Sequence, residues 1–157
     1  MNLYSEFFRF DSHAHFVAFI NHIAALLEKR DDTINLPRLA KELKKSGLIS
    51  TQDTADVHAL LGQAAPFACK AAILRNNLFA HRSAALSYPE AFNKAAVTPN
   101  EWRDLTEIAL KFVNRLLTAR GLQEHGFDTD PLTDVEAMMK ALSQFPPASL
   151  QDGARRA

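Results

Sequence analysis

The hydrophobic pattern along the chain is that of helices. Near the start, four apolar side chains recur at steps of three or four residues: Phe16, Ile20, Ile23 and Leu27. This is the period of one helix face rather than of a strand. The pattern predicts a first helix over about residues 11–30, with a start a little earlier also possible from the sequence.

Capping signals delimit a short second helix and open a third. Asn35 is a suitable N-cap, Pro37 fits the first turn because proline has no amide to leave unpaired, and Gly47 can end the helix. Ser50 followed three residues later by Asp53 approximates a capping box. The third helix should therefore open near residue 51.

The third helix is apolar around most of its circumference, which predicts that it is the central and most buried helix and that it continues to about Arg82. Pro66 removes one helical hydrogen bond, so a kink or short break is expected between Gly62 and Pro66. Cys69, among alanines and a phenylalanine, is expected to pack inside rather than to act as a nucleophile.

The remaining chain predicts two more helices. Residues 83–97 read as an irregular or weakly helical connection with a turn at Tyr88-Pro89. Thr98 and Glu101 form a capping box that opens a helix ending at Gly121, and a similar signal at Thr133 opens a last helix to about residue 143. The predicted fold is an all-α, up-and-down bundle of four to five main helices, with one domain over residues 1–145 and a flexible tail over 146–157.

Composition narrows the functional classes. Eighteen Lys and Arg balance eighteen Asp and Glu among 157 residues, so a contact with nucleic acid would have to be local. The single cysteine excludes an internal disulfide and favours a reducing compartment. No apolar run is expected to reach the roughly 18 residues of a membrane span, and no targeting segment is evident. These features predict a cytoplasmic protein without a membrane contact.

The segment AAILRNNLFAHRS, Ala71–Ser83, concentrates the candidate chemistry. No Asp or Glu occurs between Val57 and Pro89, whereas Lys70, Arg75 and Arg82 lie in this window. A locally positive segment favours an anion as its ligand. A purely structural interpretation stays open, because Arg and His near a helix C-terminus also complement the helix dipole.

The succession of Arg75 and Asn76, a short apolar turn and then Ala80-His81-Arg82 resembles the signature of the HEPN superfamily of helical ribonucleases and RNA-associated modules. Five residues separate Arg75 from His81. The ending AHR and the layout of the chain look most like the abortive-infection U-type branch (AbiU-like). The resemblance covers the central helices and is not expected to extend beyond about Gly121.

This resemblance implies metal-independent RNA cleavage with no cofactor and no metal. His81 would take the proton from a ribose 2′-hydroxyl, which then attacks the adjacent phosphate and leaves a 2′,3′-cyclic phosphate; histidine can exchange a proton near neutral pH. Arg75 would hold the phosphate, and Asn76 would orient His81 or the phosphate. Three further side chains are expected to contact RNA phosphates: Lys70, Asn77 and Arg82.

The same resemblance implies a homodimer. On a straight helix, at about 100° per residue, Arg75 and His81 would point about 120° apart, so they can converge only through a distorted turn or a second copy of the helix. HEPN proteins generally pair two such helices into one cleft. RNA, a second copy and an antitoxin protein are the partners implied, in a phage-defence or toxin role.

A second functional class stays open: a non-catalytic dimeric HEPN-like module that binds RNA, a nucleotide or a partner protein. Other enzyme classes lack their motifs, since the sequence contains no P-loop, no dinucleotide-binding glycine pattern, no HExxH and no Gly-x-Ser-x-Gly. His15 and His22 share a helix face, but no Glu or Cys at suitable spacing completes a metal site. They are interpreted as surface histidines.

Overall fold

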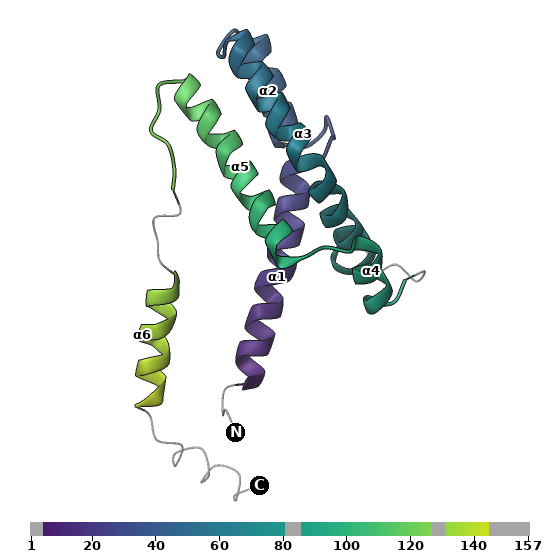
Figure 1. Ribbon diagram of the computed structural model, residues 1–157, viewed down its shortest axis with the longest axis vertical. Coiled ribbons are helices and arrows are strands. Elements are labelled where there is room, and N and C mark those ends of the chain that lie inside the picture. Colours follow the sequence, from purple (N-terminus) through teal and green to yellow (C-terminus); the bar gives the residue numbers. More distant parts are fainter. Residues whose placement is uncertain (1–4, 81–85, 127–130, 145–157) are drawn as a thin grey trace, which may run out of the picture. The chain divides into compact units, whose positions relative to one another are not determined.

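The computed structural model of the protein describes residues 5–80, 86–126 and 131–144, and these are mostly helical (Figure 1). The first compact unit, Met1–Glu124, contains most of the helices: α1 (Ser5–Leu27), α2 (Leu36–Lys45), α3 (Thr51–Leu74), the π-helical turn η1 (Arg75–Phe79), α4 (Tyr88–Ala95) and α5 (Pro99–Ala119). The second unit, His125–Ala157, contains α6 (Pro131–Ser143). All secondary structure in the described ranges is helical, which confirms the predicted fold class.

Three of the predicted helix starts carry the expected caps. The Asn35 side chain accepts a hydrogen bond from the Arg38 amide at 2.9 Å, and α2 begins at the next residue. Ser50 and Asp53 form a reciprocal capping box at the start of α3, as do Thr98 and Glu101 at the start of α5. These caps satisfy amides that have no partner within the helix, which is why the sequence located these starts well.

The connection over residues 83–97, expected to be irregular or weakly helical, contains a helix, α4. Ser87 and Glu90 form a capping box, and Pro89 lies in the first turn. The helix ends at Ala95, and the C-cap residue Ala96 adopts a left-handed conformation with φ 45°. Residues 81–85, which precede this helix, lie outside the described residues. The Tyr88-Pro89 pair is therefore a helix start rather than an isolated turn.

Helix α3 is continuous through Pro66, so of the kink or short break expected between Gly62 and Pro66, the break is not present. Both residues are exposed, and a carbonyl that loses its amide partner to proline can be hydrated there. The departure from regular α-helix comes later, at Arg75–Phe79. The first helix also differs from its expected bounds, since α1 begins at Ser5 and ends at Leu27.

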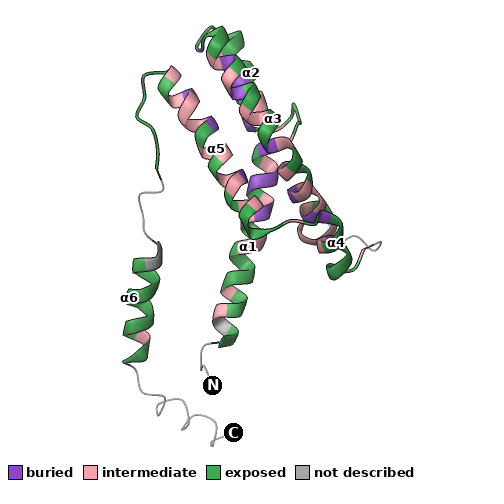
Figure 2. Cartoon of the chain, viewed as in Figure 1, coloured by how far each residue is buried: buried purple, intermediate pink, exposed green. Residues whose placement is uncertain are grey.

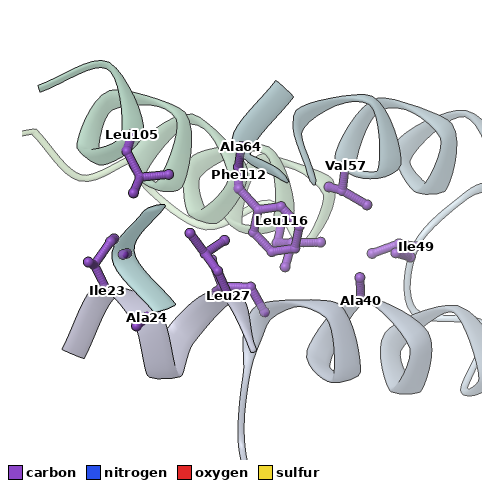
Figure 3. Close-up of a cluster of buried hydrophobic side chains, with 12 residues drawn as sticks. Ile23, Ala24, Leu27, Ala40, Ile49, Val57, Ala64, Leu105, Phe112 and Leu116 are labelled. Carbon is purple, nitrogen blue, oxygen red and sulfur yellow. The ribbon is translucent and has the colours of Figure 1, made fainter. Parts of the chain in front are cut away.

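The hydrophobic core lies where α1, α2, α3 and α5 meet (Figures 2 and 3). It is built from buried side chains of these helices and the α2–α3 connection: Ile23, Ala24, Leu27, Leu36, Ala40, Ile49, Val57, Ala64, Ala71, Leu105, Phe112 and Leu116. A second cluster around Ile20, Leu74 and Ala95 joins α1, the end of α3 and α4. Leu74 is fully buried, so the turn that follows it starts from a fixed point in the core.

Helix α3 is central, as predicted, because it contacts α1, α2, α4 and α5. It is not covered on all sides. By length and composition Thr51–Phe79 could cross a membrane, since an 18-residue window within it has a mean hydropathy of 1.3, which corrects the expectation that no segment would qualify. Only 22% of that window is buried, so most of its residues are at least partly accessible in this chain. Contacts with four other helices account for part of its apolar composition.

Helix α6 begins at Pro131, two residues before the predicted Thr133, and ends at Ser143 as expected. Val135, Met138 and Met139 leave an apolar stripe exposed on it. The predicted single domain over residues 1–145 stays a prediction. The tail expected over residues 146–157 lies outside the described residues.

Candidate functional site

The candidate motif begins on a widened helical turn. The Ala80 amide donates to the Arg75 carbonyl at 2.8 Å, an i to i+5 bond that defines the π-helical turn Arg75–Phe79. The Asn77 side-chain amide donates to the Ile73 carbonyl at 2.6 Å. Single π-helical turns occur often at functional sites because they change the direction in which side chains project. A distorted turn, one of the two ways in which Arg75 and His81 were expected to be able to converge, therefore begins at Arg75.

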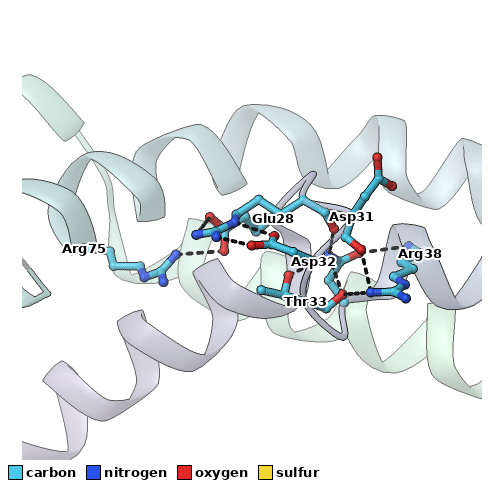
Figure 4. A network of polar contacts seen from close by, with 8 residues as sticks. Glu28, Asp31, Asp32, Thr33, Arg38 and Arg75 are labelled. Atoms are coloured by element: carbon cyan, nitrogen blue, oxygen red, sulfur yellow. Dashed lines mark hydrogen bonds and ion pairs between the residues drawn. The ribbon is translucent and has the colours of Figure 1, made fainter.

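Arg75 reaches back to the end of α1, where its Nη1 lies 3.2 Å from Oε2 of Glu28 (Figure 4). Both side chains are about one quarter exposed, at 25% each. Glu28 also lies 3.8 Å from the Arg30 guanidinium, which binds Asp32 in a two-pronged contact at 2.9 and 2.5 Å. This contact with Arg30 lowers the pKa of Asp32 below its ordinary value. The motif arginine is thus anchored in a network of alternating charges.

Arg75 and Asn76 lie in the wall of an open groove between the end of α1 and α3, with a volume of about 290 Å³. Most of the other lining side chains are small or apolar: Ala24, Leu27, Ala65, Ala68, Cys69 and Ala72. Two charged side chains, Glu28 and Lys29, complete the lining. Asn76 is exposed, and its side chain makes no hydrogen bond to another described residue. Its amide is therefore available to a ligand in the groove.

A neighbouring hollow of about 340 Å³ shares four lining residues with this groove: Leu27, Lys29, Ala65 and Ala68. His58 and Gly62 extend it toward the start of α3. We call the two together the α3 groove. Cys69 is exposed and lines it, which corrects the expectation that this cysteine packs inside. The α3 groove is the uncovered side of the central helix.

Lys70, expected to contact RNA, is already engaged on another side of α3. Its Nζ lies 2.5 Å from Oε1 of Glu101 and donates to the Ala96 carbonyl at 2.8 Å. It thereby joins α3 to the end of α4 and to the capping box of α5. Lys70 does not line the α3 groove. Asn77 is similarly engaged with Ile73, so a phosphate contact by Lys70 or Asn77 stays a prediction that would require these bonds to open.

The Lys70–Glu101 contact predicts a dependence of stability on acid. The Lys70 ammonium and the Thr98 amide both hold the pKa of Glu101 below its ordinary value of 4.5. A carboxylate with a lowered pKa stabilises the fold above its unfolded pKa, and this contribution is lost as pH falls through the lowered pKa. As the pH is lowered below about 4.5, the melting temperature of Glu101→Gln should therefore decrease less than that of the wild type.

Melting temperatures from neutral pH into this acidic range measure this effect. Glu107→Gln is the matched control, because Glu107 lies on the same helix in an exposed pair with Arg103 at 3.9 Å. Glu101→Gln and the wild type losing stability in parallel would contradict the assignment.

His81 and Arg82, the expected base and an expected phosphate contact, lie outside the described residues, so their geometry is untested. Just before this segment in the chain, Leu78 and Phe79 line a hollow of about 230 Å³. Its other walls come from His13 on α1 and from Leu86, Ser87 and Tyr88 at the start of α4. The rings of Phe79 and Tyr88 meet at 6.3 Å, edge to face.

Sequence reasoning missed Glu28 as the partner of Arg75, because 47 positions separate them and no local signal connects them. It also missed the aromatic contact of Tyr88, although the capping box that begins α4 was visible in the sequence. The His15 Nδ1–H donates to the Asp11 carbonyl at 2.9 Å, and Nδ1 lies 3.4 Å from the Asp11 carboxylate. In the described part of the chain, no group of three or more His, Cys, Asp or Glu side chains is arranged to hold a metal ion.

An all-helical bundle whose central helix ends in an Arg-Asn turn has the features of a HEPN-like module. A family model described as AbiU2, in the HEPN superfamily, matches residues 1–139. The chain belongs to the AbiU2 family, and is thus a HEPN-type module related to abortive infection. The match continues past Gly121 into α6, farther than the sequence resemblance was expected to reach. No curated protein and no solved structure matches the chain.

Proposed function

We propose that this protein is a metal-independent endoribonuclease that cleaves RNA by attack of a ribose 2′-hydroxyl on the adjacent phosphate. The observation that carries the proposal is the position of Arg75 and Asn76, on a π-helical turn and in the wall of an open groove. A planar, always-charged guanidinium suits a phosphate whose oxygens gain charge during the reaction. His81 supplies the general base, in agreement with its place in the family signature.

The reaction balances with these groups. His81 removes the 2′-hydroxyl proton as the oxygen bonds to phosphorus, and the bond from phosphorus to the 5′-oxygen of the next nucleotide breaks. That oxygen takes a proton from water and His81 returns its proton to water, which gives a free 5′-hydroxyl and a 2′,3′-cyclic phosphate. Arg75 binds the non-bridging oxygens, and Asn76 orients the phosphate. Arg82 adds a phosphate contact in this proposal.

The first test is cleavage of a mixed RNA pool in the presence of EDTA. Wild-type protein should cleave it, and Arg75→Ala should lower the rate by about 10²–10³-fold, the usual cost of removing one stabilising donor. Arg103→Ala is the control, since Arg103 is an exposed cation on α5. Equal cleavage by wild-type and Arg75→Ala protein would contradict the assignment. Uncleaved RNA that is retained on a gel would favour the alternative, a module that binds RNA, nucleotide or protein without cleavage.

The α3 groove supports a homodimer as part of this proposal. Five small or polar residues recur at alternating steps of three and four along α3 and η1: Gly62, Ala65, Cys69, Ala72 and Asn76. This spacing keeps one face in register with a second helix, and small side chains permit close approach. The large uncovered share of this apolar helix gives a second copy a surface to bury. Packing along this face brings two Arg75 turns toward one cleft.

Ala65→Arg should therefore produce a monomer and abolish most cleavage, because a long charged side chain would lie within the paired face. Gln63→Arg is the matched control, since Gln63 is exposed on the same helix and does not line the groove. Sedimentation of both variants measures the change. A dimer that survives in Ala65→Arg would contradict this interface.

The biological setting follows from the family as a proposal. A ribonuclease of this kind would act in the cytoplasm against RNA during phage infection, as a toxin whose activity is held back by an antitoxin protein until infection. RNA in the uninfected cell would then stay uncleaved because the antitoxin protein inhibits the ribonuclease.

A further inference from the structure

Among the described residues, Glu28 is the one that forms a hydrogen bond and an ion pair with the side chain of Arg75. Its carboxylate lies 3.2 Å from Nη1 of Arg75, and its own amide donates to the Ala25 carbonyl at 3.4 Å just beyond the end of α1. Arg30 lies 3.8 Å away on its other side and is itself bound to Asp32. The carboxylate is thus located by two cations and by a helix end, which makes it a fixed anchor (Figure 4).

The contact with Glu28 uses one edge of the Arg75 guanidinium and leaves a second edge available to a ligand. Glu28 engages only Nη1, and no hydrogen bond joins Nε or Nη2 of Arg75 to a described residue. A guanidinium has five N–H donors in a fixed plane, so holding one nitrogen fixes the direction of the others. The remaining donors match the two non-bridging oxygens of a phosphate in number and spacing.

The charge of Glu28 does not close the groove to an anion. The charged residues that line the groove around Arg75 are Glu28, Lys29 and Arg75 itself, so two cations accompany one carboxylate. Arg30, beside Glu28, offsets its charge further. A phosphate can therefore bind Arg75 without displacing Glu28.

We infer that Glu28 is a positioning residue, which holds the Arg75 guanidinium in the direction required to bind the phosphate of the RNA being cleaved. The inference rests on the proposed function, because it assigns a role within the same site. Without Glu28, Arg75 is a long side chain with several rotamers and must be ordered anew each time a phosphate binds. Displacement of a positioning contact by about 1 Å can cost about 10²-fold in rate.

A double-mutant cycle tests this inference, with the variants Glu28→Ala, Arg75→Ala and the combination of the two. Glu28→Ala should lower kcat by about 10–100-fold and change KM less. The double variant should be no slower than Arg75→Ala alone, because Glu28 acts only through Arg75. Glu28→Gln, which keeps an oxygen acceptor for Nη1, should recover part of the loss. Glu107→Ala is the control on an exposed carboxylate, with wild-type kinetics expected.

Binding of a fluorescent DNA strand, which carries phosphates but no 2′-hydroxyl to react, gives a second readout. Both Glu28→Ala and Arg75→Ala should weaken this binding, again without additivity. Equal or faster cleavage by Glu28→Ala, with Arg75→Ala inactive, would overturn the inference and leave the proposed function standing. RNA left intact by the wild type would overturn the proposed cleavage. In that case, equal or tighter strand binding by Glu28→Ala would also overturn the inference, whereas weaker, non-additive binding would support it for a binding site.

Discussion

Replacing His81 with alanine is expected to reduce RNA cleavage by about 10²–10⁴-fold, the usual contribution of a general base. His81→Ala should retain RNA binding, since the phosphate contacts of Arg75 remain. Initial rates on a labelled RNA, with binding measured on a DNA strand of the same sequence, separate the two effects.

Two controls make the His81 result specific. The helical circular dichroism and melting temperature of His81→Ala should match those of the wild type, and His22→Ala, on the exposed face of α1, should cleave normally. A pH–rate profile adds an independent reading, because loss of the base should remove the rise in rate with pH on the acidic side. Full activity of His81→Ala would contradict the assignment of the base.

The second large effect concerns stability. Phe112→Ala should destabilise the bundle by about 3–5 kcal/mol, because it removes a ring that is 1% exposed at the centre of the core and leaves a cavity that its neighbours fill only in part. This is a large share of the roughly 5–15 kcal/mol that stabilises an ordinary domain. Urea denaturation of the wild-type and variant proteins measures the difference.

Phe10→Ala is the matched control for Phe112→Ala, since Phe10 is 72% exposed and lies in the first turns of α1. Its effect should stay within about 0.5 kcal/mol, as for most surface substitutions. A small effect of Phe112→Ala would mean that the packing of α5 against α3 contributes less to stability than its burial indicates.

The helix pattern of this chain was predictable where the signals are local. Asn35 and the Ser50 and Thr98 capping boxes fixed three helix starts, because an N-cap side chain bonds to an amide only a few positions away. The same kind of signal at Ser87 and Glu90 begins α4, but the Tyr88-Pro89 pair was interpreted as a turn. Proline at the first helical positions is compatible with a helix, so the capping box was the better guide.

The features that depend on tertiary packing were not predictable. Pro66 was expected to kink or briefly break α3, yet the helix is continuous there, and the exposed position of Pro66 allows water to hydrate the freed carbonyl. Cys69 was expected inside, but the side of α3 that carries it has no helix over it. The pairing of Arg75 with Glu28 requires the end of α1 to lie beside the end of α3, which no sequence pattern specified.

The candidate site was predicted in part. The sequence located the motif at the end of the central helix and indicated that a regular helix could not bring Arg75 and His81 together. The structure has a π-helical turn beginning at Arg75, and it assigns Asn77 and Lys70 contacts within the protein. The convergence of Arg75 with His81 stays a prediction.

The most direct measurement of the central claim is the product of cleavage on a defined RNA strand in EDTA. The account predicts fragments with a 2′,3′-cyclic phosphate and a 5′-hydroxyl, identified by mass, and no cleavage at a nucleotide whose 2′-hydroxyl is replaced by hydrogen. Fragments with a 5′-phosphate, or cleavage at the 2′-deoxy position, would contradict it.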